Sequence, residues 1–406
     1  MANTWVTLSN GDIARKGLSR LHNKLRFIPS INRDYDEEFG RKGAKNGGTL
    51  LIREPNRFTV RSGEAMATQD LAESSQSLVM SYLRGVDIDI SSVDHTLSVD
   101  SFEERILDPA MDQLAAQVEY VFLSTVYKQV YNLTGTPATT PASLAAVLNA
   151  GARLSQNLAP TNNRSVLIDS VGMAATVNGI GTYFHKASEI EKGFSDGFIG
   201  RAAGFAFYES NMVPAHTNGS RTDSTPITDT STWANGDTTI TTTGQTNAQT
   251  VKAGDVFTVA GVYAVNPETK QAYSHLQQFV ITADLTCDTT DVFAVAPTIY
   301  ISGAKQNVSV TSAGSGKAVV HVAAGGSGAA STAYTQPLAY HKDAFTFVCA
   351  DEYIMPGENM TRAKHDGLSL RVWRKGDQTN NTFPLRLDIR FGFKATRPEW
   401  CVRMRG

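Results

Sequence analysis

The residue types that usually carry catalysis or cofactor binding do not form a recognised constellation in this sequence. The segment AGSGK at 313–317 is partly like a phosphate-binding loop, but its distal glycine is missing and Lys317 is followed by Ala318 in place of Ser or Thr. A glycine-rich loop within a β-domain is the better interpretation. No HExxH pair and no pair of cysteines at zinc-binding spacing is present. The sequence therefore predicts neither a nucleotide site nor a zinc site.

The histidines and acidic pairs favour structural roles over catalytic ones. We expect four histidines to be polar surface or loop residues and not ligands, namely His185, His216, His341 and His365. Adjacent acids such as Glu37–Glu38 and Glu103–Glu104 point apart on a helix and make poor acid–base couples. Neither a GxSxG elbow nor a Cys/His signature is visible. We predict that the chain is not an enzyme and has no catalytic, metal-binding or cofactor-binding residues.

Three cysteines, Cys287, Cys349 and Cys401, lie far apart in the sequence. Their odd number argues against a disulfide framework and for synthesis in a reducing compartment. The segment MANTWVTLSNGDIARK at the start lacks the basic-then-apolar pattern of a secretion signal, and no apolar run is long enough to span a bilayer. We therefore expect a protein that is made and folded in cytoplasm and has no membrane partner.

The net charge of −2 conceals an uneven distribution of charge along the chain. Residues 1–62 contain twelve basic and six acidic side chains, which gives this segment a net charge of +6. The tail is also basic, through Arg371, Arg374, Arg386, Arg390, Arg397, Arg403 and Arg405. Two basic ends around an acidic middle suggest differently charged faces, and solvated surface charge explains the pattern equally well.

The elements that would position functional side chains fall into two kinds of sequence. From Thr217 to Thr335 the chain is rich in Thr, Gly, Ser and Ala, with short alternating apolar runs, whereas its flanks have the composition of mixed helix and strand. A domain inserted into another needs its two ends close together at the surface. We therefore predict an α+β host fold, discontinuous in sequence, that carries an antiparallel β-barrel or sandwich.

The N-terminal part predicts one helix followed by extended strands. Apolar residues recur at helical spacing after Asn10, and this helix should stop before Pro29. The run VDIDI at 86–90 alternates apolar and acidic residues, as in a half-exposed strand. Between 49 and 96 the predicted strands are TLLIREP, RFTVRSG, SSQSLVMSYL and GVDIDISSV. Because an isolated hairpin is marginally stable in water, this region needs a surface to lie on, in its own domain or on another subunit.

The remaining sequence predicts a long helix and then alternating strands and helices. Asp108 and Pro109 are the expected N-cap and first residue of a helix that continues to Tyr131, roughly 35 Å at 1.5 Å per residue. A second helix should begin at Thr140–Pro141 and run to Leu154. The predicted strands are SVLID, GFAFYES, VFTVAGVYAV, QQFVITADL, VFAVAPTIYI, NVSVTSA, AVVHVAA and AFTFVCADEYIM, with a closing hairpin of LSLRVWRKGD and FPLRLDIRFGFKATRPE.

Several of these segments, taken in order, carry a family resemblance. The front half contains NRDYDEEF at 32–39, then IREPNRFTVRSG, GVDIDIS and DSFEERIL. Further along come GRAAGFAFYESNMVP at 200–214, GDVFTVAGV at 254–262 and ATRPE at 395–399. In this order they resemble the major capsid proteins of tailed phages, specifically coat proteins of the Salmonella phage P22 type. The resemblance covers most of the chain, although 263–338 adds little beyond general β character.

The resemblance implies an α+β fold of the Hong Kong 97 type that is divided into named parts. These are an N-terminal arm at 1–46, an extended β-hairpin loop at 47–96, a peripheral domain with the spine helix at 97–134, an axial domain at 135–216 and 339–366, an inserted all-β, barrel-like domain at 217–338, and C-terminal strands of the peripheral domain at 367–406.

The same resemblance implies a structural function. The chain would be a major capsid protein that self-assembles, as hexamers and pentamers, into the icosahedral head shell of a double-stranded DNA tailed bacteriophage. Its partners would be further copies of itself, a scaffolding protein and the portal during assembly, and packaged double-stranded DNA bound without sequence specificity. It would reside in the virion capsid after synthesis and assembly in the cytoplasm of a host bacterium.

The extended loop supplies the candidate inter-subunit contacts, which are Arg53, Arg57, Arg61, Asp87 and Asp89. Exposed ion pairs contribute about 0 to 1 kcal/mol each, so solvated strand charge is an equal alternative. Some shells of this fold crosslink a loop lysine to an asparagine of a neighbour, whereas the stretch from 46 to 100 contains no lysine. We therefore predict a shell without covalent crosslinks, held by burial and ion pairs.

Two other function classes stay open at the level of the sequence. The threonine-rich β-insert would also suit a β-domain adhesin or glycan-binding surface protein, against which the missing export signal counts. A hydrolase with an unrecognised site would require titratable groups that converge in a pocket.

Overall fold

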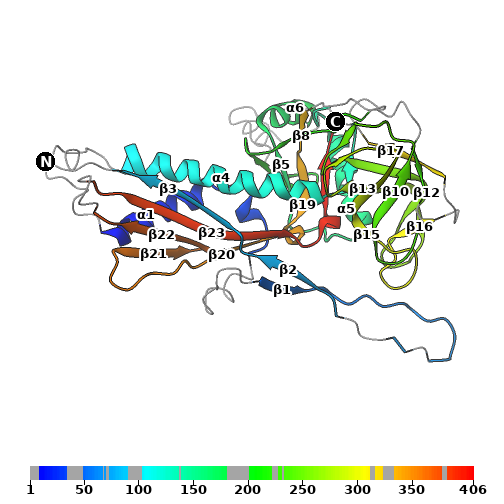
Figure 1. The fold of residues 1–406 in the computed structure, drawn as a ribbon, viewed down its shortest axis with the longest axis horizontal. Coiled ribbons are helices and arrows are strands. Elements are labelled where there is room, and N and C mark those ends of the chain that lie inside the picture. Colours follow the sequence, from blue (N-terminus) through cyan, green and yellow to red (C-terminus); the bar gives the residue numbers. More distant parts are fainter. Residues whose placement is uncertain are drawn as a thin grey trace. The chain divides into compact units, whose positions relative to one another are not determined.

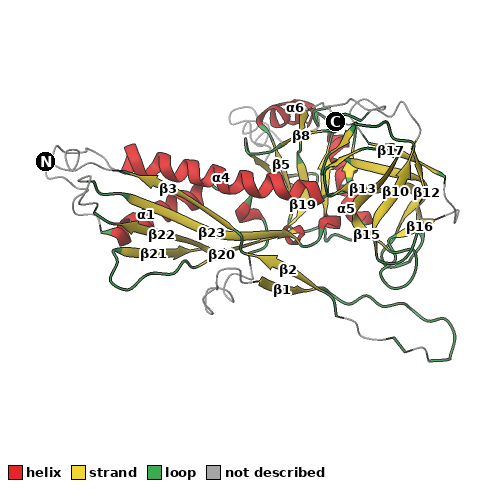
Figure 2. Cartoon of the chain, in the orientation of Figure 1, coloured by secondary structure: helices red, strands yellow, loops and turns green. Residues whose placement is uncertain are grey.

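The computed structural model describes residues 9–33, 49–66, 68–69, 73–89, 103–136, 139–180, 201–221, 227–230, 233–310, 316–322, 333–376 and 382–406. Helices and sheets are mixed in both of its compact units, as the α+β prediction expects (Figures 1 and 2). The first unit comprises Met1–Glu54, Ser75–Phe122 and Phe345–Thr396. The second comprises Pro55–Ser74, Leu123–Ala344 and Arg397–Gly406.

The first unit is built on an antiparallel five-stranded sheet that α4 (Asp108–Val126) runs alongside (Figure 1). Its strands are β3 (Tyr82–Ile88), β20 (Phe345–Ala350), β21 (Met360–His365), β22 (Leu368–Arg374) and β23 (Leu385–Ala395). β23 is central, because it pairs with β20, β22 and β3. The predicted closing hairpin is thereby confirmed, while β21 is a strand that the sequence pattern did not predict.

Alternation along β23 separates an apolar face of this sheet from a polar one. Leu385, Leu387 and Ile389 are buried on one face, and Arg386, Asp388 and Arg390 alternate with them. Helix α1 (Asn10–Lys24) packs on the apolar side. A Cβ placed on its Gly17 would come within 3.2 Å of Leu370 and 3.3 Å of Met111, so α1 lies close against both β22 and α4.

Helix α1 confirms the predicted N-terminal helix and begins with a capping box, in which Ser9 and Asp12 bond each other's backbone N–H groups. The turn that follows α1 is fixed by Glu119 of α4. Its buried carboxylate accepts hydrogen bonds from the backbone N–H groups of Arg26 and Phe27, each at 2.6 Å. Burial raises the pKa of Glu119, and these backbone donors counteract it. Most of the polar stretch predicted as an arm, at 34–48, lies outside the described residues.

The predicted spine helix exists, with different ends. A π-helical turn, Glu103–Leu107, precedes α4, so the chain is already helical at Asp108, which is therefore not an N-cap. The Asp108 carboxylate instead forms an ion pair with Arg20 of α1 at 2.8 Å. At its other end α4 continues as a 3-10 turn, Tyr127–Gln129, and stops before the predicted limit at Tyr131.

The predicted strands between 49 and 96 separate into a hairpin and a strand of the main sheet. β1 (Thr49–Arg53) and β2 (Ser75–Val79) form an antiparallel pair. Ile52, Leu78 and Met80 pack with Val348 and Ala350 of β20. RFTVRSG, which was predicted as a strand, has no regular structure, because none of its backbone pairs with another strand.

Strand β3 also differs from its predicted place in the extended loop. Its residues Tyr82–Ile88 pair along their whole length with β23, so this strand belongs to the main sheet. The long-range partner decides its position, since Val86 and Ile88 stand opposite the buried Leu387 and Leu385. Ile90 lies outside the described residues.

The second unit contains a six-stranded sheet in the order β4-β24-β19-β5-β7-β6. Its strands are β4 (Leu133–Thr134), β5 (Arg164–Ile168), β6 (Arg201–Ala202), β7 (Phe205–Glu209), β19 (Leu338–His341) and β24 (Cys401–Met404). The predicted strands at 165–169 and 204–210 are confirmed as β5 and β7. Helices α5 (Leu144–Gln156) and α6 (Ser170–Ile180) contribute to the core beside it. Helix α5 is capped by Ser143 rather than by the predicted Thr140, because the Ser143 hydroxyl accepts from the backbone N–H of Ala146.

Between 227 and 321 the strands of the second unit pair with one another in an antiparallel ring. The order is β13-β15-β10-β9-β17-β12, and β12 pairs again with β13, which closes the ring, while β16 extends β12. The strands are β9 (Ile227–Asp229), β10 (Asp237–Thr243), β12 (Val256–Val265), β13 (Ala272–Ile281), β15 (Thr290–Ile299), β16 (Val308–Val310) and β17 (Lys317–His321). Phe257, Phe279 and Phe293 fill its centre. The threonine-rich sequence DTTITTT at 237–243 forms β10, because every second side chain along it can face this core.

Two short ladders complete the second unit. β11 (Thr250–Val251) pairs with β14 (Leu285–Thr286). β8 (Ala215–Thr217) pairs antiparallel with β18 (Ala333–Thr335). We call the part of the chain between these two strands, which contains the ring, the barrel segment. The chain therefore enters and leaves the barrel segment on adjacent strands.

The unit boundaries require a correction to the assignment of the C-terminal third. β20 and β21, assigned from sequence to the axial domain, belong to the sheet of the first unit because β20 pairs with β23 over six residue pairs. Residues 397–406, assigned to the peripheral domain, belong to the second unit because β24 pairs with β19 and β4.

Candidate functional site

The search for reactive groups gives no starting point for catalysis. Within the described residues, no group of three or more His, Cys, Asp or Glu side chains could hold a metal ion. In the same part of the chain, no helix is both long and apolar enough to cross a membrane. The candidates for function are therefore the five predicted contact residues and the surfaces around them.

The three predicted arginines follow β1 into the loop between β1 and β2. Arg53 is the exposed last residue of β1. Arg57 forms a long ion pair with Glu399 of its own chain, at 3.7 Å. Arg61 donates hydrogen bonds to the backbone carbonyls of Gly63 and Ala65. The structure thus keeps all three on one exposed stretch of chain.

The same stretch of chain exposes large apolar side chains, which sequence reasoning did not single out. Val60 is 96% exposed and Met66 82%, while Phe58 and Leu51 are 61% and 64% exposed. Isolated exposed apolar residues are common on protein surfaces, but several within one short segment mark a site of interaction. We call residues 51–66 the contact loop.

The two predicted aspartates lie elsewhere, on and just beyond β3. Asp87 is an exposed β3 residue whose carboxylate is 3.9 Å from the guanidinium of Arg386. Asp89 follows the strand and is exposed. Because β3 belongs to the main sheet, the aspartates lie on a different element from the arginines of the contact loop.

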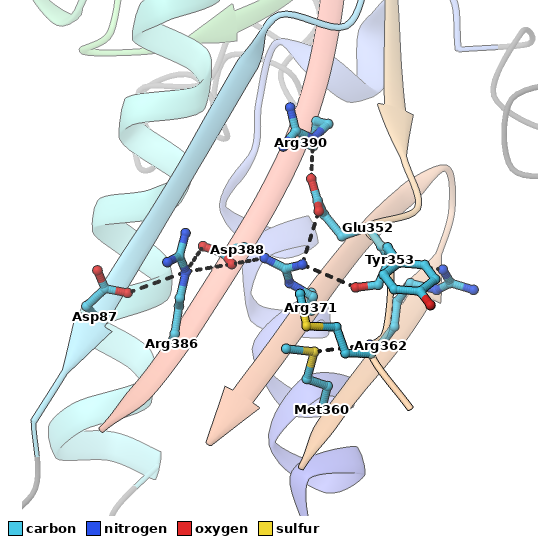
Figure 3. A network of polar contacts seen from close by, with 10 residues as sticks. Asp87, Glu352, Tyr353, Met360, Arg362, Arg371, Arg386, Asp388 and Arg390 are labelled. Carbon is cyan, nitrogen blue, oxygen red and sulfur yellow. Dashed lines mark hydrogen bonds and ion pairs between the residues drawn. The ribbon is translucent and has the colours of Figure 1, made fainter. Parts of the chain in front are cut away.

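Asp87 is the outer member of an ion-pair network on the polar face of the first unit's sheet (Figure 3). The network consists of Asp87, Glu352, Arg371, Arg386, Asp388 and Arg390. Arg371 links its two inner carboxylates, with nitrogen–oxygen distances of 2.5 Å to Asp388 and 3.1 Å to Glu352. Arg386 binds Asp388 at 2.8 Å, and Arg390 binds Glu352.

The centre of this network is buried, which gives it more weight than a surface ion pair. Asp388 is 2% exposed and is bonded by two guanidinium groups. Gly85 of β3 stands opposite Asp388, and a Cβ there would lie 2.5 Å from its Oδ1, so only glycine leaves room for the carboxylate. Hydrogen bonds to Asp388 raise the pKa of Arg386. The alternation of LRLDIRF was the sequence signal that could have found this polar face.

The predicted surface histidines require a correction. His216 is 2% exposed and His341 is also buried, whereas His365 is exposed as expected and His185 lies outside the described residues. His216 can be buried because both ring nitrogens have partners. Its Nε2 is 2.7 Å from Asp255 and its Nδ1 is 3.1 Å from the Tyr127 hydroxyl. Burial lowers the pKa of His216, and the hydrogen bond to Asp255 opposes this.

The basic C-terminal tail is likewise not a free cationic surface. Arg371, Arg386 and Arg390 are members of the ion-pair network. Arg403 and Arg405 are buried in the second unit. Positive charge in this tail is thus bonded or buried within the folded chain.

Comparison with known proteins decides which kind of protein carries these surfaces. Residues 64–406 match the family model described as P22 coat protein, gene protein 5. The chain belongs to the P22 coat protein family. The coat protein is therefore a structural protein, a major capsid protein that forms the phage head shell and resides in the virion capsid. This membership decides against the adhesin and hydrolase alternatives. A search of curated proteins finds no match to the sequence.

Several solved structures are similar to the chain at low sequence identity. A chain of Mycobacterium phage Che8 is 13% identical, with a TM-score of 0.50, and the match covers 93% of the coat protein and 90% of that chain. The capsid of Ralstonia phage GP4 is 8% identical, with a TM-score of 0.42 and coverage of 92% and 87%. A virus-like particle from Pyrococcus furiosus is 7% identical, with a TM-score of 0.39 and coverage of 96% of both chains. The Che8 match supports a Hong Kong 97-type capsid fold.

The buried centre of the ion-pair network should contribute more stability than its rim. Replacing Asp388 by Ala leaves Arg371 and Arg386 without their shared acceptor and should lower the free energy of unfolding by about 3 kcal/mol. Asp87→Ala removes an exposed partner of the same Arg386 and should cost no more than about 1 kcal/mol. Urea unfolding of both variants measures the difference, and equal losses would contradict this account of the network.

The coat protein should lose stability in acid through His321 of β17. Burial lowers the pKa of His321 to about 3, and its ring packs against Phe257 and Phe293 at centroid distances of 5.6 and 6.1 Å. Below pH 6.5 the His321 ring is protonated in the unfolded chain but stays neutral in the folded chain. The free energy of unfolding therefore falls as the pH drops from neutral toward 3. His321→Phe should remove about 2 kcal/mol of the loss between pH 6.5 and 4.5.

Chemical unfolding at these two pH values measures the effect. His365→Phe provides the matched control, because it makes the same replacement at an exposed position of the first unit. An unchanged pH dependence in His321→Phe would show that His321 is protonated normally in the folded state.

Proposed function

We propose that the coat protein assembles as hexamers and pentamers into the closed icosahedral shell, with the contact loop of each subunit lying on a neighbour. The exposed apolar side chains of this loop carry the proposal. Covering Phe58, Val60 and Met66 removes apolar surface from water, which stabilises association at about 25 cal/mol per Å². A loop of this composition is unfavourable on an isolated subunit and favourable when repeated at every subunit boundary.

The predicted charged contacts take a secondary part in this proposal. Arg53, Arg57, Arg61, Asp87 and Asp89 are candidates for pairing across the boundary, and each exposed pair is worth about 0 to 1 kcal/mol. Arg57 and Asp87 already have partners at 3.7 and 3.9 Å in their own chain. Assembly would replace these long ion pairs by ion pairs between subunits. Charge would therefore contribute more to how neighbouring subunits are aligned than to how tightly they bind each other.

The barrel segment is proposed to be an inserted domain, carried by an otherwise continuous host. The pairing of β8 with β18 supports this, because adjacent ends are what an insertion needs. The predicted division of the chain keeps its arm at 1–46 and its insert at 217–338, while β3 is taken out of the loop predicted at 47–96. Its peripheral and axial parts are adjusted to the strand pairings of β3, β20, β21 and β24.

Assembly would require partners beyond the coat protein itself. A scaffolding protein and the portal are proposed to guide closure of the shell, and packaged double-stranded DNA to contact basic residues without sequence specificity. The N-terminal segment is the candidate for this contact, because residues 1–62 have a net charge of +6. Synthesis and assembly are proposed to take place in the cytoplasm of the host bacterium, and no enzymatic step is required.

Placing a charge on the contact loop should prevent assembly without unfolding the subunit. Val60→Asp should reduce the yield of closed shells about tenfold or more, because burying a carboxylate costs several kcal/mol. The fold should survive, since Val60 is 96% exposed. Negative-stain electron microscopy of the chain co-expressed with its scaffolding protein measures shell yield, and circular dichroism measures folding.

Val60→Ile is the matched control, because it keeps an apolar side chain at the same position and should assemble normally. If Val60→Asp forms shells as well as Val60→Ile does, the contact loop is not buried between subunits.

Shells of the coat protein should contain no covalent crosslinks between subunits, since no lysine lies between 46 and 100 to form them. Purified shells boiled in detergent should therefore run as a single monomer band on a gel. A ladder of covalent oligomers would contradict this prediction.

A further inference from the structure

Two arginines at the C-terminal end of the second unit are buried. Arg403 of β24 and Arg405, which follows the strand, are 1% and 2% exposed. Within the described residues, each has a single protein acceptor. Arg403 Nη1 donates to the Gly254 carbonyl at 2.7 Å, and Arg405 Nη1 donates to the Thr335 carbonyl.

The remaining donors of both guanidinium groups have no acceptor. Among the described residues, nothing accepts a hydrogen bond from Nε or Nη2 of Arg403, or from Nε or Nη2 of Arg405. The Nδ2 of Asn218 is a further buried donor without a partner, and Asn218 lies in the same cluster because its Oδ1 accepts from Tyr334 at 2.9 Å. Five N–H-bearing atoms therefore remain unsatisfied in one region.

Aromatic rings hold the two guanidinium groups in this region. The guanidinium carbon of Arg405 lies 4.1 Å from the centre of the Tyr334 ring, and that of Arg403 lies 5.4 Å from the Tyr127 ring. Both rings pack edge-on against His216. The two arginines are therefore parts of one cluster and not separate buried residues.

Two described carboxylates act on this cluster. Asp169 contributes negative charge near Arg405, but no hydrogen bond joins it to either guanidinium group. Asp255 is already occupied. Oδ1 of Asp255 is bonded to His216, and Oδ2 accepts from the backbone N–H groups of Gly219 and Lys252 at 3.2 and 2.8 Å. Asp255 can therefore offset part of the positive charge, but it does not supply acceptors for either guanidinium.

Deprotonation cannot relieve the excess charge. Burial lowers the pKa of Arg403 to about 10 and that of Arg405 to about 9, so both stay positive at neutral pH. A buried charge needs a counter-charge as well as hydrogen bonds, and bridging water would supply only the second.

We propose that Arg403 and Arg405 together bind a small inorganic anion, chloride or an oxyanion such as phosphate, through their Nε and Nη2 groups. The Asn218 side chain is in position to add a donor from the start of the barrel segment. Because β8 and β18 lead into and out of this segment beside the cluster, the anion would fasten the barrel to β24. The proposal concerns the single chain and does not depend on assembly.

Thermal unfolding of the unassembled full-length chain tests the site. Chloride should raise the unfolding midpoint relative to gluconate at equal ionic strength, by about 3–6 °C for each tenfold rise above the dissociation constant. Arg405→Met should abolish this response. Repeating the series with phosphate distinguishes an oxyanion site from a halide site.

Arg164→Met is the matched control. Arg164 is also a buried arginine of the second unit, but its nitrogens bond the carbonyls of Gly151, Ala159 and Pro160 and the hydroxyl of Ser155. Its replacement should lower the midpoint in every salt and leave the response to anions intact. A response that persists in Arg405→Met would overturn the proposal.

If Arg405→Met does not fold, crystallography of the wild-type chain tests the proposal instead. Crystals of the wild-type chain soaked in bromide should show an anomalous peak in contact with both guanidinium groups, or phosphate density there if the site prefers oxyanions. Density explained by water alone, together with equal midpoints in chloride, phosphate and gluconate, would show that no anion binds.

Discussion

A cluster of aromatic rings around Phe122 is the interaction on which the first unit depends. The Phe122 ring lies 4.5 Å from that of Phe393 and 5.0 Å from that of Phe27, and it also packs against Phe345 and Phe347. These residues come from α4, from the turn after α1, and from two strands far along the chain. Offset and edge-on ring pairs of this kind add about 0.5–1.5 kcal/mol each beyond the area that they bury. The cluster thus joins segments that sequence separates and fixes the sheet against its helices.

That anchoring explains how the coat protein can expose so much apolar surface elsewhere. One face of the sheet is committed to the aromatic core, and the other is divided between the base of the β1–β2 hairpin and the ion-pair network. Ile52, at the start of the contact loop, packs in the base of the hairpin, whereas Phe58, Val60 and Met66 take no part in either. These exposed apolar residues are therefore not required for folding of the subunit. A shell protein needs this separation, because a contact surface that also held the fold together could not be left uncovered before assembly.

Period-two alternation in the sequence was enough to predict strands such as β5, β12 and β23, because each has one buried face. It failed where a distant partner decides the outcome. β3 looked like part of the extended loop and instead pairs with β23. β24 escaped prediction because CVRM places Arg403 where a core strand should be apolar, and His216 was assigned to the surface because its side chain is polar. Burial of these polar groups rests on aromatic and carbonyl partners that local sequence does not reveal.

The central claim is that this coat protein forms its shell by burying the contact loop against a neighbouring subunit. A cryo-electron microscopy map of assembled particles tests it most directly, since the path of residues 51–66 can be traced in every subunit. The account predicts that Phe58, Val60 and Met66 of each subunit are in contact with an adjacent subunit. A closed shell in which these side chains still face solvent would contradict it.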